Sequence, residues 1–162
     1  MYKTKHSLSI LVVEDNTEIL DKIISRIAYQ FGFGVQILTA KRFKMAKSII
    51  EKKLYDIAII DLQLPDGHGE DLIALIREKN FFIPIIVQTS EESVAYQAMV
   101  HNKYENLIYL TKDTLFDELE NRLEKANRRY QKSSNLRLAT HGGSKIDCID
   151  INDICYISSI TN

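Results

Sequence analysis

A short apolar run that ends in one carboxylate constrains the fold of this chain more than any other feature. Residues 57–60 are all apolar, Asp61 follows them, and the turn-forming sequence Pro65-Asp66-Gly67 comes shortly afterwards. A run rich in β-branched residues, without polar alternation, is typical of a strand that is buried on both faces of a parallel sheet. In open sheets of this class, ligands bind beyond the carboxyl ends of the strands. We therefore predict that Asp61 lies at the chemically active edge of the sheet.

Three further, largely apolar runs end in polar residues. They are residues 8–13 before Glu14 and Asp15, residues 83–87 before Thr89, and residues 107–110 before Lys112. If the four runs are parallel neighbours, three carboxylates, a hydroxyl and an ammonium group meet at one edge of the sheet. Taken singly, an acidic pair after a strand is often only a helix cap, and a lysine there is usually solvated. The agreement of all four strand ends favours a functional site.

Helical periodicity separates these strands. Apolar residues recur at helical spacing after Asn16 and Thr17, either of which can cap the first helix, and Gly32 can end it. The predicted helices cover residues 17–31, 43–50, 72–80, 90–102 and 114–126, and a further strand covers residues 35–38. This alternation predicts a doubly wound α/β fold, since parallel strands need crossover connections. Right-handed crossovers and short loops favour a flavodoxin-like, five-stranded parallel sheet in the order 2-1-3-4-5, which brings the acidic pair beside Asp61.

The overall charge and the hydropathy pattern argue against two classes of protein. A net charge of -1 shows no global basic bias of the kind that indicates a nucleic-acid-binding protein. No apolar run approaches the roughly 20 residues that a transmembrane helix needs. Residues 1–10 lack the apolar core and the cleavage site of a signal peptide. We therefore expect a cytoplasmic protein without a membrane partner.

The composition changes near residue 122. Between residues 122 and 145 the chain carries seven basic residues and one acidic residue. A β pattern follows over residues 136–140, 145–149 and 154–160, with a Gly142-Gly143 turn between the first two. A segment of about 30 residues is too short to fold alone without cross-links. We expect a first domain over residues 1–131, followed over residues 132–162 by a linker and the first strands of a second domain.

The three carboxylates predicted at the sheet edge require a cation. Crowded carboxylates raise the pKa of at least one of their number unless a positive charge lies among them. Mg²⁺ suits Glu14, Asp15 and Asp61, directly or through water, because it keeps several waters and needs few protein ligands. The absence of histidine and cysteine nearby in the sequence argues against zinc. With Lys112 and Thr89 able to pair with phosphoryl oxygens, we expect Asp61 to attack phosphorus and form an acyl phosphate.

Residues 8–130 resemble the receiver domain of two-component response regulators, a family with the CheY-like form of the flavodoxin-like fold. The matching residues are Glu14, Asp15, Asp61, Pro65, Gly69, Thr89, Tyr109 and Lys112. The resemblance implies a phosphorelay in which Asp61 accepts a phosphoryl group from a sensor histidine kinase. It also implies Mg²⁺ bound by the acidic cluster and by the backbone carbonyl of Gln63. Slow autodephosphorylation is expected in place of substrate turnover, so the chain is not expected to be an enzyme.

The resemblance also implies a two-state switch. The Thr89 hydroxyl moves to the phosphoryl group on Asp61, and Tyr109 turns inward to fill the space left behind. This movement changes the surface formed by residues 90–102, the last strand and the last helix. We therefore expect phosphorylation to change formation of a homodimer or contact with an output domain.

One residue departs from the family pattern. Receivers usually have proline after the lysine, with a cis peptide bond, whereas Asp113 follows Lys112 here. A cis bond before another residue costs about 2.5–4 kcal/mol, so either the site tolerates strain or the loop runs differently. Lys-Asp at this point is similar to receivers of regulators that carry a LytTR DNA-binding domain. Residues 136–162, with KIDCIDINDICYISS, are similar to the first strands of that domain, so DNA is an expected partner of the output.

Two other functions fit part of the pattern. A phosphatase of the haloacid-dehalogenase type also uses a strand-end aspartate and Mg²⁺, but it typically has a second aspartate where this chain has Gln63. A pseudo-receiver binds partners without accepting phosphate and usually lacks an acidic residue of the site, and all three are present here. Turnover of a phosphate monoester would indicate the phosphatase. Failure to gain phosphate in the presence of Mg²⁺ would indicate the pseudo-receiver.

Overall fold

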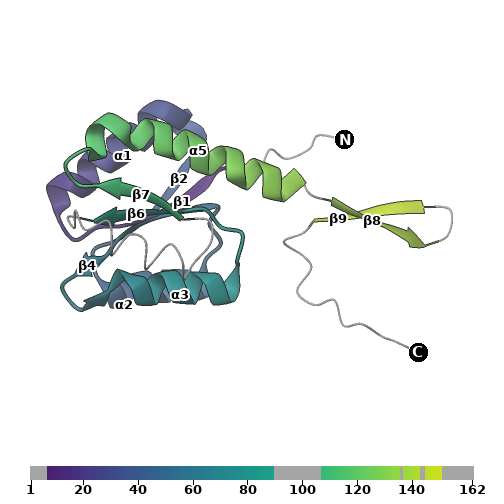
Figure 1. The fold of residues 1–162 in the computed structure, drawn as a ribbon, viewed down its shortest axis with the longest axis horizontal. Coiled ribbons are helices and arrows are strands. Elements are labelled where there is room, and N and C mark those ends of the chain that lie inside the picture. Colours follow the sequence, from purple (N-terminus) through teal and green to yellow (C-terminus); the bar gives the residue numbers. More distant parts are fainter. Residues whose placement is uncertain (1–6, 90–106, 136, 143–144, 151–162) are drawn as a thin grey trace.

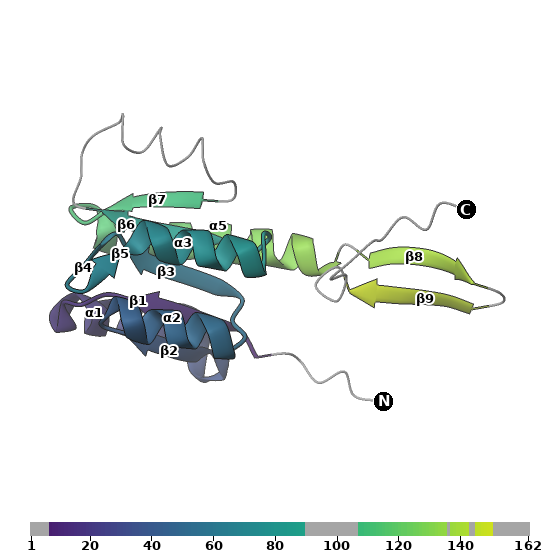
Figure 2. The ribbon, with the colours of Figure 1, turned by 90° about the horizontal axis from the view of Figure 1, so that it is seen from below.

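A parallel five-stranded sheet forms the centre of the fold. The structure is a computed structural model that describes residues 7–89, 107–135, 137–142 and 145–150. The strands of the sheet are β1 (Ser9–Val13), β2 (Gln36–Ala40), β3 (Ile57–Asp61), β6 (Ile85–Thr89) and β7 (Leu107–Thr111). They are all parallel and pair in the order β2-β1-β3-β6-β7, which can be followed across the sheet by turning from Figure 1 to Figure 2. This is the predicted order 2-1-3-4-5, so the flavodoxin-like, CheY-like fold is confirmed.

Helices cover both faces of the sheet (Figures 1 and 2). α1 (Thr17–Phe31) and α5 (Leu115–Asn135) lie on one face, and α2 (Phe43–Lys52) and α3 (Gly69–Lys79) lie on the other. The helix predicted over residues 90–102 lies outside the described residues. Within the described part of the chain, no helix combines the length and the apolar character needed to cross a bilayer.

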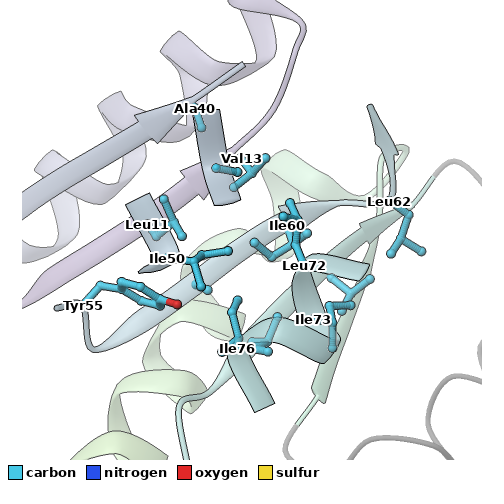
Figure 3. Close-up of a cluster of buried hydrophobic side chains, with 14 of the residues drawn as sticks. Leu11, Val13, Ala40, Ile50, Tyr55, Ile60, Leu62, Leu72, Ile73 and Ile76 are labelled. Atoms are coloured by element: carbon cyan, nitrogen blue, oxygen red, sulfur yellow. The ribbon is translucent and has the colours of Figure 1, made fainter. Parts of the chain in front are cut away.

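Alternate residues of the buried strands contribute to two hydrophobic layers. On the side of α2 and α3, Leu11 and Ile60 pack with Ile76 (Figure 3). On the side of α1 and α5, Val12 and Ile59 belong to the second layer. Successive side chains of a strand point to opposite faces. A strand between two helical layers is therefore apolar at every position, which explains the unbroken apolar runs in the sequence.

Helix α1 begins and ends where local signals predict. The Asn16 side chain accepts hydrogen bonds from the backbone N–H groups of Glu18 at 2.9 Å and Ile19 at 3.2 Å, so Asn16 is the cap. Gly32 follows the helix with a φ of 72°, a conformation that residues with a Cβ rarely adopt. It leads into a short 3-10 helix, η1 (Gly32–Gly34).

A small hairpin follows β3, where the sequence predicts only a turn. β4 (Gln63–Leu64) and β5 (Gly67–His68) pair in antiparallel fashion around the turn. Strands of two residues are too short to show alternation in a sequence, so the turn alone was predictable. α3 also begins at Gly69, earlier than predicted, because its apolar periodicity becomes visible only at Leu72.

The basic C-terminal segment continues α5 and then forms two paired strands. α5 extends to Asn135, so the domain boundary expected after residue 131 falls within this helix. β8 (Arg137–Gly142) and β9 (Lys145–Asp150) form an antiparallel hairpin. This confirms the first two of the three predicted C-terminal strands. The third, over residues 154–160, lies outside the described residues.

A buried side chain of β6 has no hydrogen-bond partner within the described part of the chain. Gln88 in β6 is fully buried, and among the described residues neither atom of its side-chain amide has a hydrogen-bond partner. Leaving a buried polar group unsatisfied costs about 1–3 kcal/mol. The strand that ends at Thr89 is therefore less stable than its apolar neighbours alone would make it.

We expect Gln88→Met to raise the free energy of unfolding by about 1 kcal/mol or more, because methionine fills a similar space without needing a hydrogen bond. Urea unfolding should show a higher midpoint at an unchanged slope. Ile86→Val in the same strand is the control, and it should lose about 0.5–1.5 kcal/mol. A loss of stability in Gln88→Met would show that the amide has a partner, such as a buried water.

Candidate functional site

Three strand ends bring the predicted acidic cluster and its lysine to the carboxyl edge of the sheet. Glu14 and Asp15 follow β1, Asp61 ends β3, and Lys112 follows β7. β1 and β3 are neighbours in the sheet, and carboxylate oxygens of Glu14, Asp15 and Asp61 lie within 4.8 Å of one another. Glu14 and Asp61 are buried, whereas Asp15 is exposed. The three carboxylates predicted from separate strand ends therefore form one cluster.

Lys112 reaches this cluster from the end of β7. Its Nζ donates a hydrogen bond to Oδ2 of Asp61 at 2.6 Å and lies 3.7 Å from Oε2 of Glu14. All peptide bonds of the described residues are trans, including the bond between Lys112 and Asp113. The Thr114 N–H closes the loop by donating to the Thr111 carbonyl at 3.2 Å. The missing proline left two possibilities for this loop, a strained cis bond or a different path. The loop takes a different path, with a trans bond after Lys112.

Backbone N–H groups hold both buried carboxylates. The Asn16 N–H donates to Oε1 of Glu14, and the Gln63 N–H donates to Oδ1 of Asp61, each at 3.0 Å. Asp61 therefore has a donor on each oxygen, the Gln63 N–H on Oδ1 and the Lys112 ammonium on Oδ2. The residue pattern did not predict these backbone donors, because every residue except proline carries the same N–H. The available signal was their position, since an aspartate side chain often bonds the backbone two residues on.

Negative charge exceeds positive charge in this cluster. Burial, followed by the charge of Asp61, raises the pKa of Glu14 to about 7, although the Asn16 N–H and Lys112 act in the opposite direction. Burial alone would lower the pKa of Lys112, but its hydrogen bond with Asp61 and the carboxylate charges outweigh burial and raise that pKa. A further cation would therefore be stabilised here at neutral pH.

The residues of the cluster fit Mg²⁺. This ion prefers oxygen ligands and keeps several waters, so a few carboxylates suffice. Asp15 is exposed and leaves one side open to solvent, while the buried Oε2 of Glu14 has no hydrogen-bond partner among the described residues. Asp61 completes the set of carboxylates. The backbone carbonyl of Gln63 as a further ligand stays a prediction.

A glycine lets the chain pack closely against the end of β3. A Cβ atom at Gly69 would lie 2.2 Å from the carbonyl oxygen of Asp61 and 2.7 Å from Cα of Leu62. The Gly69 N–H donates to the Leu62 carbonyl at 3.0 Å. Any side chain at this position would therefore displace the strand end that carries Asp61.

The two predicted switch residues lie in adjacent strands. Thr89 ends β6, opposite Thr111 of β7, and its side chain lies outside the described part of the structure. Tyr109 of β7 packs against the hydrophobic layer under α2 and α3, and its hydroxyl is buried. Burial and the charge of Glu70 raise the pKa of Tyr109 to about 12. The switch roles of Thr89 and Tyr109 stay predictions.

A family comparison agrees with this geometry. Residues 10–124 match the response regulator receiver domain. This chain belongs to that family. Receiver domains of two-component systems are phosphoacceptors that interact with sensor histidine kinases and bind Mg²⁺ at an acidic site. The acidic site of this family therefore accounts for the cluster of Glu14, Asp15 and Asp61.

A relative of this receiver domain is the transcriptional regulatory protein BasR of Escherichia coli (strain K12). The two sequences are 29% identical over 136 residues, which is 81% of this chain and 57% of BasR. The chain thus spans little more than half the length of that relative.

Solved receiver domains share the fold. A CheY-like receiver domain protein from Methanospirillum hungatei JF-1 has a TM-score of 0.65 and 24% identity, and the match covers 77% of this chain and 98% of that chain. The receiver domain of sensor histidine kinase PA1611 from Pseudomonas aeruginosa PAO1 has a TM-score of 0.62 and 24% identity, over 74% of this chain and 97% of that chain. The PA1611 structure has a magnesium ion coordinated in its active site cleft.

Without a divalent cation, the free energy of unfolding should fall as pH rises from about 4.5 to about 7. The pKa of Glu14 is higher in the folded than in the unfolded protein, so the folded state keeps this proton longer and loses that advantage as the group ionises. We expect a loss of no more than about 3 kcal/mol.

Urea unfolding in EDTA at several pH values measures this dependence. Glu14→Gln should lack the Glu14 contribution and should be more stable than the wild type above the folded pKa. Asp21→Asn, which removes an exposed carboxylate of α1, should keep the wild-type slope. Equal slopes for the wild type and Glu14→Gln would contradict the raised pKa.

Proposed function

We propose that this chain is the phosphoryl-accepting part of a response regulator and that Asp61 takes the phosphoryl group from a sensor histidine kinase. The observation that supports this most directly is the buried Asp61 carboxylate, 2.6 Å from the Lys112 ammonium and within 4.8 Å of the oxygens of two further carboxylates. A carboxylate in this setting can act as a nucleophile on phosphorus once a divalent cation offsets the surplus negative charge.

The proposed transfer exchanges one bond at phosphorus for another. A carboxylate oxygen of Asp61 attacks the phosphorus of a phosphohistidine, so that a P–O bond forms and the P–N bond breaks. The imidazole leaves with the electron pair of that bond and takes up a proton. Lys112 is close enough to Asp61 to pair with a phosphoryl oxygen. Mg²⁺, held by the acidic cluster and the Gln63 carbonyl, would supply charge neutralisation.

In the proposed switch, phosphorylation of Asp61 changes the positions of residues in β6 and in the edge strand β7. The Thr89 hydroxyl moves to the phosphoryl oxygens, and Tyr109 moves toward the space left behind. In the sheet register Thr89 lies opposite Thr111, and Val87 lies opposite Tyr109. A shift at the end of β6 therefore acts on the strand that carries Tyr109. The result would be a change in homodimer formation or in contact with the output domain.

The proposed output is regulation of transcription through a LytTR-type DNA-binding domain. In this assignment residues 1–131 are the receiver, and residues 132–162 are a linker and the first strands of the output domain. Support comes from the sequence KIDCIDINDICYISS, from the β8–β9 hairpin and from the Lys112-Asp113 pair. The relative BasR is a transcriptional regulatory protein, which supports the proposed role in transcription but does not bear on the type of DNA-binding domain.

Intact mass after incubation with phosphoramidate or acetyl phosphate and Mg²⁺ tests the acceptor. We expect the wild type to gain one phosphoryl group and Asp61→Asn to gain none, because an amide is a poor nucleophile toward phosphorus. Asp21→Asn is the control and should behave as the wild type. A folded wild-type protein that gains no phosphate with Mg²⁺ present would support the pseudo-receiver, and steady turnover of a phosphate monoester would support the phosphatase.

Thr89→Ala tests the switch separately from the chemistry. This variant should still be phosphorylated, but its phosphorylation should no longer change self-association, because the hydroxyl that joins the phosphoryl group is missing. Sedimentation velocity with and without phosphodonor measures the change, with Thr39→Ala in the distant strand β2 as the control. A full change in self-association in phosphorylated Thr89→Ala would show that the hydroxyl is not needed.

A further inference from the structure

Helix α2 begins without a cap of its own. Within the described structure its N-cap residue, Arg42, makes no capping hydrogen bond through its side chain, and the first turn contains no acidic residue. Instead, Lys41, Arg42 and Lys44 lie at the end of the helix where the dipole is already positive. The first N–H groups of such a helix need an acceptor from elsewhere in the chain.

Asp66, at the tip of the β4–β5 hairpin, supplies this acceptor. Its Oδ1 accepts a hydrogen bond from the Phe43 N–H at 2.6 Å, and its Oδ2 accepts one from the Lys44 N–H at 3.2 Å. Desolvation works against the charge of Asp66, but these two N–H groups and the charge of Arg42 outweigh it and keep the pKa of Asp66 below its ordinary value. The hairpin therefore caps α2 with an ionised carboxylate.

The hairpin also packs directly on the first residue of the helix. A Cβ atom at Gly67 would lie 2.5 Å from Cγ of the Phe43 ring. The backbone at Gly67 thus contacts the Phe43 side chain, while the neighbouring Asp66 holds the Phe43 N–H. These two contacts attach the tip of the hairpin to the start of α2.

The other end of the β4–β5 hairpin contacts Asp61, the proposed phosphoryl acceptor. Its first residue, Gln63, donates its N–H to Oδ1 of Asp61 at 3.0 Å and pairs with His68 across the hairpin. The backbone carbonyl of Gln63 is also the further Mg²⁺ ligand proposed above. A displacement of the hairpin would therefore alter both the hydrogen bond to the acceptor and the position of that carbonyl.

We propose that Asp66 is a positioning residue of the phosphorylation site, which holds the β4–β5 hairpin against α2 and thereby keeps the N–H and the carbonyl of Gln63 in place beside Asp61. The inference rests on the phosphoacceptor function proposed above. Asp66 does not touch the reacting atoms and acts through the hairpin. The sequence contained one indication of this contact: the helix predicted over residues 43–50 has no typical capping residue directly before it.

Four variants distinguish the proposed positioning role of Asp66 from two other effects, a general loss of stability and the loss of one negative charge. Asp66→Ala removes both acceptor oxygens, whereas Asp66→Asn keeps an oxygen that can cap the helix. Ile50→Val weakens the buried face of α2 and leaves the cap intact. Asp71→Ala removes a carboxylate from the first turn of α3, so it makes the same change in charge at a residue outside α2 and the hairpin.

The first measurement is amide hydrogen exchange by NMR in metal-free protein. In Asp66→Ala the amides of Phe43 and Gln63 should both exchange faster relative to the core amide of Ile59. Asp66→Asn should restore much of the protection. In Asp71→Ala and Ile50→Val the ratio of Gln63 exchange to Ile59 exchange should stay at the wild-type value.

The second measurement is Mg²⁺ affinity by titration, combined with the rate of phosphorylation by phosphoramidate. Asp66→Ala should bind Mg²⁺ about 10-fold more weakly, the scale found when groups that orient metal ligands are removed. Asp66→Asn should lie between Asp66→Ala and the wild type, and the two controls should match the wild type. Raising the Mg²⁺ concentration should return the phosphorylation rate of Asp66→Ala toward the wild-type rate.

Two outcomes overturn the inference. In one, Asp66→Ala exposes the Phe43 amide but leaves Gln63 exchange and Mg²⁺ affinity unchanged, so that the cap serves α2 alone. In the other, Ile50→Val weakens Mg²⁺ binding as much as Asp66→Ala does. A wild-type protein that gains no phosphate contradicts the proposed function instead, and the metal-free exchange measurement still decides whether Asp66 controls Gln63.

Discussion

The crowding of three carboxylates against one ammonium group governs the chemistry of this receiver. Lys112 lies 2.6 Å from Asp61 and 3.7 Å from Glu14, so one positive charge is shared between two buried acids. Burial, and then the charge of Asp61, raise the pKa of Glu14 to about 7. The negative charge that remains is the physical reason why a divalent cation, and then a phosphoryl group, would be stabilised beside Asp61.

The two hydrophobic layers hold this charge in place. β1 and β3 are buried along their whole length, and their register sets Val13 opposite Ile60. The next residues, Glu14 after β1 and Asp61 at the end of β3, therefore lie side by side at the carboxyl edge of the sheet. A shift of one residue in either strand would turn its carboxylate to the other face and expose the apolar residues of that strand. The packing of the core and the geometry of the site thus depend on the same register.

Backbone groups also fix the positions of the side chains in the site. The N–H groups of Asn16 and Gln63 hold the two buried carboxylates, and the absence of a side chain at Gly69 lets α3 start against the end of β3. In β6, by contrast, the buried amide of Gln88 is without a partner among the described residues. The loop after β3 is therefore well supported, while the strand that carries the predicted switch residue contains a local energetic cost.

The pattern of residues along the chain was enough to predict the fold and the acidic cluster, because apolar periodicity and the polar residue at each strand end are local signals. Lys112 was predicted at the site in the same way. The sequence did not decide whether the bond from Lys112 to Asp113 is cis or trans, and it is trans in the structure. The capping of α2 by Asp66 and the burial of the Gln88 amide away from any described partner depend on which distant segments meet. No local pattern records a backbone N–H or a missing partner, so these contacts follow only from the way the loops and layers pack in three dimensions.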